Sequence, residues 1–207
     1  MILKELVLTA MAENCYIVAC EETKEAAVID PGGNAQTILR ALQDDDLKAV
    51  YIINTHGHTD HIGANREVKA ATGADILIHE ADAKMLVNAV SNFSFFTGAN
   101  IISPAASRLL KDGDTIKIGS TVELEVIHTP GHTLGGICLK SGNIIFVGDT
   151  LFNGSIGRTD FPGGSYNDII QSIKTRLLCF SDDTICYPGH GPSTTIGFER
   201  KYNPFLI

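Results

Sequence analysis

Apolar residues occur along the chain mostly in short segments separated by turn sequences, which is the pattern of β-strands rather than of long helices. Glycine-containing turns, such as residues 30–33 and 141–142, follow several of these segments. We predict strands at residues 3–8, 15–19, 26–29, 49–53, 75–78, 121–127, 136–140, 144–147 and 184–187.

Helical spacing of apolar residues occurs between these strands. It predicts a helix at residues 34–43, with Asn34 as the N-cap, and a second helix that begins at the end of residues 55–61 and reaches Ala71. Further helices are predicted at residues 80–89 and 166–178, and a short one around Phe198. Both halves of the chain pass from several strands to a βα unit, which favours two sheets packed face to face with helices outside them. With no linker and no repeat visible, we predict a single domain over residues 1–207.

Residues 91–106 are apolar but irregular, and they include Phe93, Phe95 and Phe96. We expect this segment to form either a lid or part of the packing.

Composition narrows the class of protein. The formal net charge of −8 disfavours a nucleic-acid partner. Five cysteines without a C-x-x-C pair are expected to be buried and reduced, and Cys15 and Cys20 should face opposite sides of a sheet. We recognise neither a signal peptide nor an apolar run of about 18 residues, so we expect a cytoplasmic protein without a membrane partner.

Six of the seven histidines lie in or next to loops where predicted strands end. The densest group is Thr55-His-Gly-His-Thr-Asp-His61. Imidazole nitrogens and carboxylate oxygens suit zinc, iron or manganese. A purely structural zinc site would contain more cysteine, so we predict a hydrolytic site in which a metal lowers the pKa of water toward roughly 7. Alternate spacing can direct His56 and His58 to one ion, and Asp60 and His61 to a second.

Residues 55–61 resemble the T-H-x-H-x-D-H signature of the metallo-β-lactamase superfamily. Four further segments are similar to its other motifs, in the same order: Val28-Ile-Asp-Pro-Gly32, Thr129-Pro-Gly-His132-Thr, Val147-Gly-Asp149-Thr-Leu-Phe and Tyr187-Pro-Gly-His190-Gly. The resemblance implies an α/β fold, a four-layer αββα sandwich of two mixed β-sheets with helices on the outer faces.

The same resemblance implies a ligand set for two divalent metal ions, with zinc expected and iron or manganese as alternatives. One ion would be bound by His56, His58 and His132, and the other by Asp60, His61 and His190. Asp149 would bridge them, and Asp60 would also orient the water. Asp60 and Asp149 are therefore the expected catalytic residues. The remaining histidines, His79 and His128, lie outside the motifs and are expected to be structural, His79 at the surface or as a helix cap.

Residues 148–152 and 157–164 are most similar to the glyoxalase II group, and in particular to its short bacterial members. This implies a hydroxyacylglutathione hydrolase, in which metal-bound hydroxide attacks the thioester carbonyl of a small molecule such as lactoylglutathione. Full-length glyoxalase II has a C-terminal helical extension that helps to bind glutathione. Only 17 residues follow His190, so we expect no such extension. Arg158 either anchors a substrate carboxylate or pairs with Asp160.

Two other functions remain as alternatives. A persulfide dioxygenase shares a run similar to residues 157–161 but uses one iron, whereas the second set of ligands is complete here. A metal-binding redox-partner module is the alternative from another class, although the sequence supplies no flavin partner. The sequence does not predict the oligomeric state.

Overall fold

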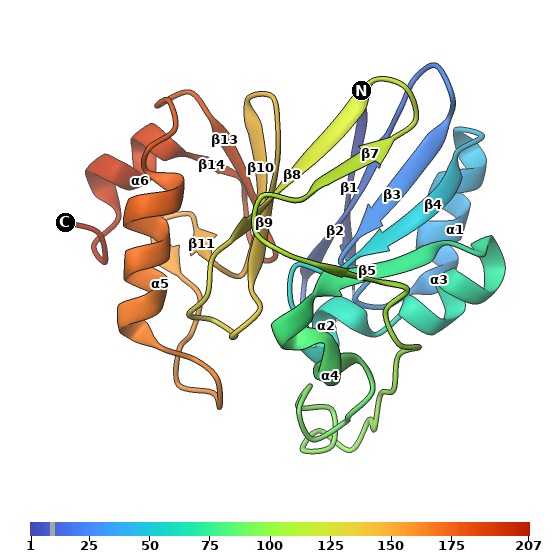
Figure 1. The fold of residues 1–207 in the computed structure, drawn as a ribbon, viewed down its shortest axis with the longest axis horizontal. Coiled ribbons are helices and arrows are strands. Elements are labelled where there is room, and N and C mark those ends of the chain that lie inside the picture. Colours follow the sequence, from blue (N-terminus) through green and yellow to red (C-terminus); the bar gives the residue numbers. More distant parts are fainter. Residues whose placement is uncertain (9–10) are drawn as a thin grey trace.

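The computed structural model describes residues 1–8 and 11–207, and most of its strands form two six-stranded sheets (Figure 1). In the first sheet the strand order follows the chain, with an antiparallel meander from β1 to β3 and parallel pairing from β3 to β6. Its strands are β1 (Ile2–Leu8), β2 (Glu13–Ala19), β3 (Glu25–Ile29), β4 (Lys48–Ile53), β5 (Asp75–His79) and β6 (Arg108–Leu110).

The second sheet has the order β14-β13-β10-β9-β8-β7. Strands β10 and β13 pair in parallel and the other neighbours are antiparallel, so this sheet is mixed as well. Its strands are β7 (Thr115–Ile118), β8 (Val122–His128), β9 (Ile137–Ser141), β10 (Ile144–Gly148), β13 (Ile185–Pro188) and β14 (Thr194–Thr195). A small hairpin, β11 (Leu151–Phe152) and β12 (Ser155–Ile156), follows β10.

Helices lie on the outer faces of both sheets (Figure 1). Those beside the first sheet are α1 (Ala35–Asp44), α2 (Thr59–Ile62), α3 (Asn65–Thr72), the 3₁₀ turn η1 (Glu80–Asp82) and α4 (Ala83–Leu86). Those beside the second are α5 (Tyr166–Ser172), continued by the π-helical segment η2 (Ile173–Leu177), and α6 (Ile196–Tyr202). The predicted αββα sandwich of two mixed sheets is confirmed.

Three apolar layers hold these elements together. The alternating burial of β8 shows the pattern: Val122, Leu124 and Val126 pack between the two sheets, while Glu123 and Glu125 are exposed. A second layer lies between the first sheet and its helices, and a third lies between the second sheet and α5 and α6. Cys15, in β2, belongs to the helix-side layer and Cys20, directly after β2, to the layer between the sheets, so they face opposite sides of the first sheet, as predicted. Four of the five cysteines are buried, whereas Cys179 is exposed, contrary to the prediction.

Several local features differ from the sequence prediction. Asn34 precedes α1, but its φ of 48° is left-handed and its side chain makes no capping hydrogen bond. The helix after residues 55–61 is divided near Gly63, because the amide of Ala64 donates to the carbonyl of Pro31 in the loop after β3. The helix predicted to reach Ala89 ends at Leu86. Strands β6 and β7 were not predicted.

None of the helices within residues 1–8 and 11–207 has the length and apolar character that crossing a membrane requires.

One buried carboxylate connects loops that belong to the two sheets. Asp82, 1% exposed, accepts a hydrogen bond from the amide of Gly57, in the loop after β4. It also accepts bonds from the Thr133 hydroxyl and the Gly135 amide, in the loop after β8, each at 2.7 Å. A Cβ atom at Gly135 would lie 2.7 Å from the Asp82 carboxyl carbon, so a residue without a side chain is needed at this position.

We predict that Asp82→Ala lowers the free energy of unfolding by about 3 kcal/mol, because three donors in the interior lose their acceptor. Urea denaturation measures this change. The exposed Glu80→Ala, which removes a surface pair with Lys111, is the matched control and should change stability by less than about 1 kcal/mol. Equal effects of the two substitutions would contradict this role for Asp82.

Candidate metal centre

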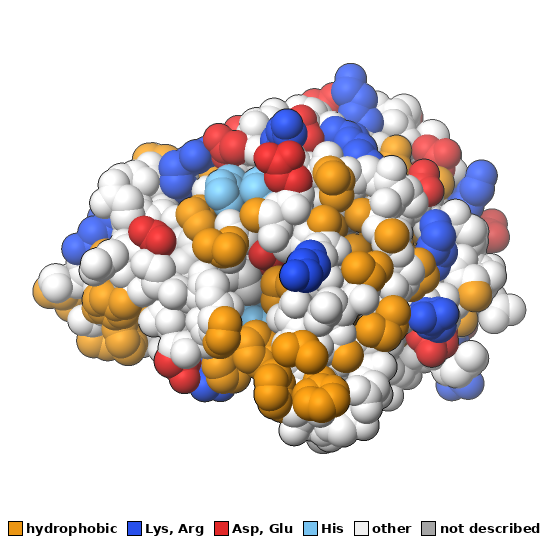
Figure 2. Space-filling view, turned by 60° about the horizontal axis from the view of Figure 1, so that its bottom comes forward, with side chains coloured by type: hydrophobic (Ala, Val, Ile, Leu, Met, Phe, Trp, Pro, Cys, Tyr) orange, Lys and Arg blue, Asp and Glu red, His pale blue; other side chains and the backbone are white. Residues whose placement is uncertain are grey.

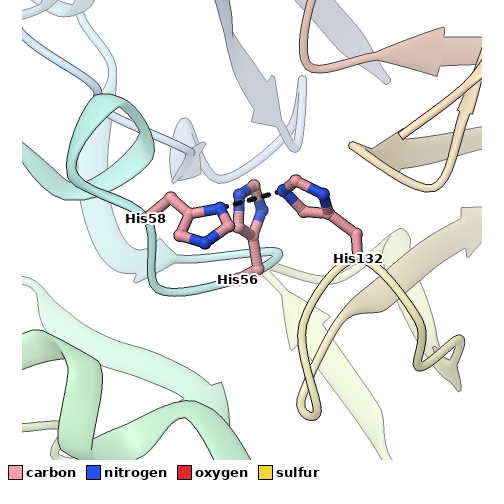
Figure 3. A group of neighbouring side chains, drawn as sticks. All are labelled: His56, His58 and His132. Carbon is pink, nitrogen blue, oxygen red and sulfur yellow. Dashed lines mark hydrogen bonds between the residues drawn. The ribbon is translucent and has the colours of Figure 1, made fainter. Parts of the chain in front are cut away.

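The predicted ligands come from four loops, each of which follows a strand. The loop after β4 and the start of α2 supply His56, His58, Asp60 and His61. Strands β8, β10 and β13 are followed by His132, Asp149 and His190 respectively. Figure 3 shows His56 and His58 from the first loop and His132 from the second, with their rings directed toward one another.

The structure brings all of these side chains together. The possible ligand atoms of His56, His58 and His132 lie within 4.8 Å of one another, and the same is true of Asp60, His61 and His190. These are the two groups predicted from the sequence. A third group, His56, His61 and Asp149, connects them.

Asp149 lies between the two groups. One of its oxygens, Oδ1, is 3.4 Å from Nε2 of His61. The other, Oδ2, is 3.6 Å from Nε2 of His132 and 3.8 Å from Nε2 of His190. A carboxylate that bridges two cations must reach both sets of ligands, and Asp149 does so.

Hydrogen bonds outside the cluster orient the rings. His61 Nδ1 is 3.1 Å from Oδ2 of Asp30, His132 Nδ1 donates to the carbonyl of Arg158 at 2.8 Å, and His190 Nδ1 donates to the carbonyl of Met11 at 3.2 Å. Each of these contacts leaves Nε2 directed toward the cluster, as is usual for histidines that bind metal.

His58 has the opposite orientation. Its Nδ1 lies 2.9 Å from Nε2 of His132, and the dashed line in Figure 3 marks this hydrogen bond. His58 therefore presents Nδ1, rather than Nε2, to its neighbours in the cluster.

Asp30 is the support that connects the two halves of the first ligand loop. Its carboxylate accepts bonds from the amide and the hydroxyl of Thr55 at 2.7 and 2.6 Å, and it contacts His61. The Thr55 hydroxyl in turn lies 3.2 Å from Nδ1 of His56. The sequence showed Asp30 only as part of a turn and of a family motif, and its contact with His61 depends on the fold.

Several buried polar atoms of the cluster lack a hydrogen-bond partner, which indicates whether a metal would fit there. Three buried ligand atoms have no hydrogen-bond partner among the described residues: Nε2 of His56, Nε2 of His61 and Oδ1 of Asp149. Burying polar atoms without partners is unfavourable, and a cation would provide the missing interaction. Nitrogen and carboxylate oxygen donors are those that divalent zinc, iron and manganese accept. The cluster is therefore able to hold divalent metal.

The protonation of His56 and His58 also suits metal binding. Burial, together with the neighbouring His132, lowers the pKa of His58 to about 3, and burial beside His61 holds the pKa of His56 well below its ordinary value. Both rings are neutral at physiological pH and keep a lone pair for a metal. Burial would raise the pKa of Asp60, but the hydrogen bond to His190 and the charge of His61 outweigh it and hold the pKa below its ordinary value.

A cavity of about 500 Å³ opens onto the cluster, and we call it the catalytic cavity. His58, Asp60, His132, Asp149 and His190 line it on the polar side. Its apolar walls are Met11, Phe93, Phe152, Ile156 and Phe161. The volume is in the range of small-molecule sites in proteins.

Arg158 lies on the wall of this cavity, and it also pairs with Asp160 through two hydrogen bonds of 2.9 and 2.8 Å. Its guanidinium carbon is 3.6 Å from the ring centroid of Phe161. Both sequence expectations for Arg158 are therefore compatible with its position, and its role toward a substrate stays a prediction.

Glu13, at the start of β2, was not identified from the sequence. It is fully buried, and its backbone forms an isolated bridge with His190. Neither carboxylate oxygen has a hydrogen-bond partner among the described residues, and burial raises the pKa to about 9. The next residue, Asn14, donates to the carbonyls of Pro188 and Gly191 and so fixes the loop that carries His190.

His79 and His128 lie outside the cluster and have the structural roles expected for them. Nδ1 of His79 accepts a bond from the amide of Ala81 at the start of η1. His128 contacts the carbonyl of Leu134 through Nε2, and the two rings stack with centroids 4.1 Å apart.

We predict that adding zinc to chelator-treated protein raises the melting temperature by about 5–10 °C, because a ligand at about 100 times its Kd stabilises the folded state by about 2.7 kcal/mol. Differential scanning calorimetry measures the rise. It should disappear in Asp149→Asn and persist in the control His128→Asn. A similar rise in the Asp149 variant would contradict our assignment.

A second prediction concerns Glu13 in metal-free protein. Its folded pKa lies above the unfolded value, so Glu13 stays protonated in the folded state while the unfolded chain ionises above about pH 4.5. Stability is therefore lost as pH rises from about 4.5 to 9, by at most about 1.4 kcal/mol per pH unit. Relative to wild type, Glu13→Gln should become steadily more stable over this interval in denaturation curves. The exposed Glu123→Gln should follow wild type, and parallel curves for Glu13→Gln would refute the prediction.

Comparison with known proteins agrees with this geometry. Residues 8–190 match the family model of the metallo-beta-lactamase superfamily. The chain is 39% identical to hydroxyacylglutathione hydrolase GloC of Haemophilus influenzae, and the match covers 96% of this chain and 95% of that protein.

Two solved structures are also similar. BLEG-1 B3 metallo-beta-lactamase superposes with a TM-score of 0.93 at 35% identity, covering 99% of both chains. TTHA1623 in a di-iron-bound form superposes with a TM-score of 0.87 at 33% identity, covering 98% of this chain and 100% of that one. With the fold, the order of the motifs and the His/Asp cluster in agreement, the chain belongs to the metallo-beta-lactamase superfamily of hydrolases.

Proposed function

We propose that the protein is a thioester hydrolase of the glyoxalase II type, which cleaves hydroxyacyl esters of small thiols such as lactoylglutathione. The observation that carries the proposal is the complete set of seven ligand residues at an open cavity, in a chain 39% identical to a hydroxyacylglutathione hydrolase over nearly its whole length. A cytoplasmic enzyme that acts on small molecules fits the acidic composition.

Two divalent metal ions would occupy the cluster, and zinc is the metal we expect. One would be held by His56, His58 and His132 and the other by Asp60, His61 and His190, with Asp149 as a ligand of both. When bound, such ions lower the pKa of water and polarise a substrate carbonyl.

The chain's own residues prepare the reaction in three ways. The carboxylate of Asp60, 3.3 Å from Nε2 of His190, lines the cavity and can accept a hydrogen bond from water and so orient it. The hydroxyl of Thr59, buried and without a partner among the described residues, can donate a hydrogen bond to a substrate oxygen. The apolar walls lower the local polarity, which strengthens these electrostatic interactions.

The second group of ligands favours a hydrolase over a persulfide dioxygenase. A single iron held by two histidines and an aspartate would not require Asp60, His61 and His190 to converge, yet their ligand atoms also lie within 4.8 Å of one another. A redox-partner module would not need a cavity for a small molecule beside the cluster, so the catalytic cavity also favours a hydrolase.

We expect zinc-loaded protein to hydrolyse lactoylglutathione. His58→Ala and Asp149→Ala should each lower kcat/KM at least about 100-fold. Loss of a residue that hydrogen-bonds to a metal ligand typically lowers activity about 10–100-fold, and loss of a ligand itself should have a larger effect. Release of thiol measures the rate, and circular dichroism should show that both variants remain folded.

His128→Asn, outside the cluster, should retain activity. Unchanged turnover in either ligand variant would count against the proposal. One iron per chain with rapid oxygen uptake on glutathione persulfide would establish the dioxygenase instead.

A further inference from the structure

A second cavity, of about 390 Å³, lies beside the catalytic cavity. Consecutive residues of three segments line first one cavity and then the other. Asn92 faces the catalytic cavity, Ser91 the second, and Phe93 both. His132 lines the first, and Thr133 and Leu134 line the second. In the third segment, Phe161 faces the catalytic cavity, followed by Pro162 and Gly163 in the second.

Phe93 lines both cavities, at the place where they adjoin. Phe93 stacks on Phe161 with ring centroids 4.4 Å apart, and its edge lies against His58 at 5.3 Å. The backbone of Phe93 has a φ of 69°, a left-handed conformation that is costly for a large side chain and is found at functional sites. Phe93 therefore contacts a candidate metal ligand, His58, and also lines the second cavity.

Charged groups contribute little to the second cavity. Its walls include the side chains of Met85, Val90, Phe96 and Leu134. Asp82 also borders it, but its carboxylate is already engaged by three donors from the two ligand loops. Lys84 is exposed and provides the remaining charge.

Some of these walls are open to solvent. Val90 is 53% exposed, Phe96 67% and Leu134 61%. Figure 2 shows hydrophobic side chains gathered at the lower edge of the face it views. Apolar surface that lines a cavity beside a reactive centre is suited to a hydrocarbon group.

We propose that this second cavity is an acyl pocket, which binds the hydrocarbon part of the acyl group of a thioester whose carbonyl lies at the metal centre. This inference rests on the proposed function and specifies its substrate class: the preferred acyl groups are longer and more apolar than lactoyl. The assignment to the acyl side follows from chemistry, because water-soluble cellular thiols carry charged groups that a cavity with these walls would not solvate.

The test is a series of glutathione thioesters with lactoyl, butanoyl, hexanoyl and octanoyl groups, hydrolysed by zinc-loaded protein. Burial of a methylene contributes about 0.8 kcal/mol, so kcat/KM should rise about threefold to fourfold for each methylene that enters the pocket. Phe96→Ala, which removes a wall, and Ala81→Leu, which narrows the space, should each lower the octanoyl-to-butanoyl ratio at least about fivefold and leave lactoyl turnover unchanged.

Phe198→Ala on α6 is the matched control, because it removes an exposed phenylalanine far along the chain from both cavities. It should keep the full preference for long acyl groups. Acetyl esters of butanethiol and of mercaptoethanol test the thiol side, where we expect no gain from the apolar thiol.

The outcomes separate the two proposals. Turnover of short esters without any rise along the series, or a rise that persists in both pocket variants, overturns the acyl pocket alone. A gain with the apolar thiol in place of the acyl chain also overturns it. Loss of activity toward every thioester overturns the proposed function and the acyl pocket with it.

Discussion

The structure depends on holding several imidazoles and carboxylates within a few ångströms of one another in a largely buried site. Such a cluster is unfavourable by itself, since burial keeps rings such as His56 neutral and leaves ligand atoms without partners. Two packed sheets make it possible, because each contributes ligand loops at the ends of its strands while the apolar layer between them provides the stability. A divalent cation would then convert an unfavourable arrangement into a favourable one.

The supports around the cluster explain why its geometry does not collapse into ordinary ion pairs. Asp30 fixes His61 and Thr55 in one loop, and Asp82 joins that loop to the one that carries His132. Each of these carboxylates has three hydrogen-bond contacts, through which it positions backbone and rings. Asn14 has the same effect on the loop of His190, because its side-chain amide donates to two backbone carbonyl groups of that loop. Three of the four ligand loops, those after β4, β8 and β13, are thus held by residues from other parts of the chain.

Local sequence patterns predicted the layers, and the family motifs predicted which side chains would lie together in the cluster. Alternation identified strands such as β8, and the density of histidines after β4 identified the first loop. The supports could not be predicted in the same way: Asp82 and Glu13 are single acidic residues whose burial arises only when distant loops pack around them. The early end of the helix at Leu86 and the break before Ala64 likewise reflect tertiary bonds that outweigh helical propensity.

The sequence left open whether residues 91–106 form a lid or part of the packing, and the structure shows that this segment contacts the candidate site. Phe93 packs against both a candidate ligand and Phe161, so it belongs to the wall of the site. Its neighbours Phe95 and Phe96 are more than half exposed and are not needed to complete the core. An irregular loop can place Phe93 in the site while its neighbours stay exposed, because its backbone can adopt the left-handed conformation at Phe93 that a regular helix would forbid. The superfamily's metal centre is built from strand ends, whereas selectivity in this chain would come from a loop that the sheets do not constrain.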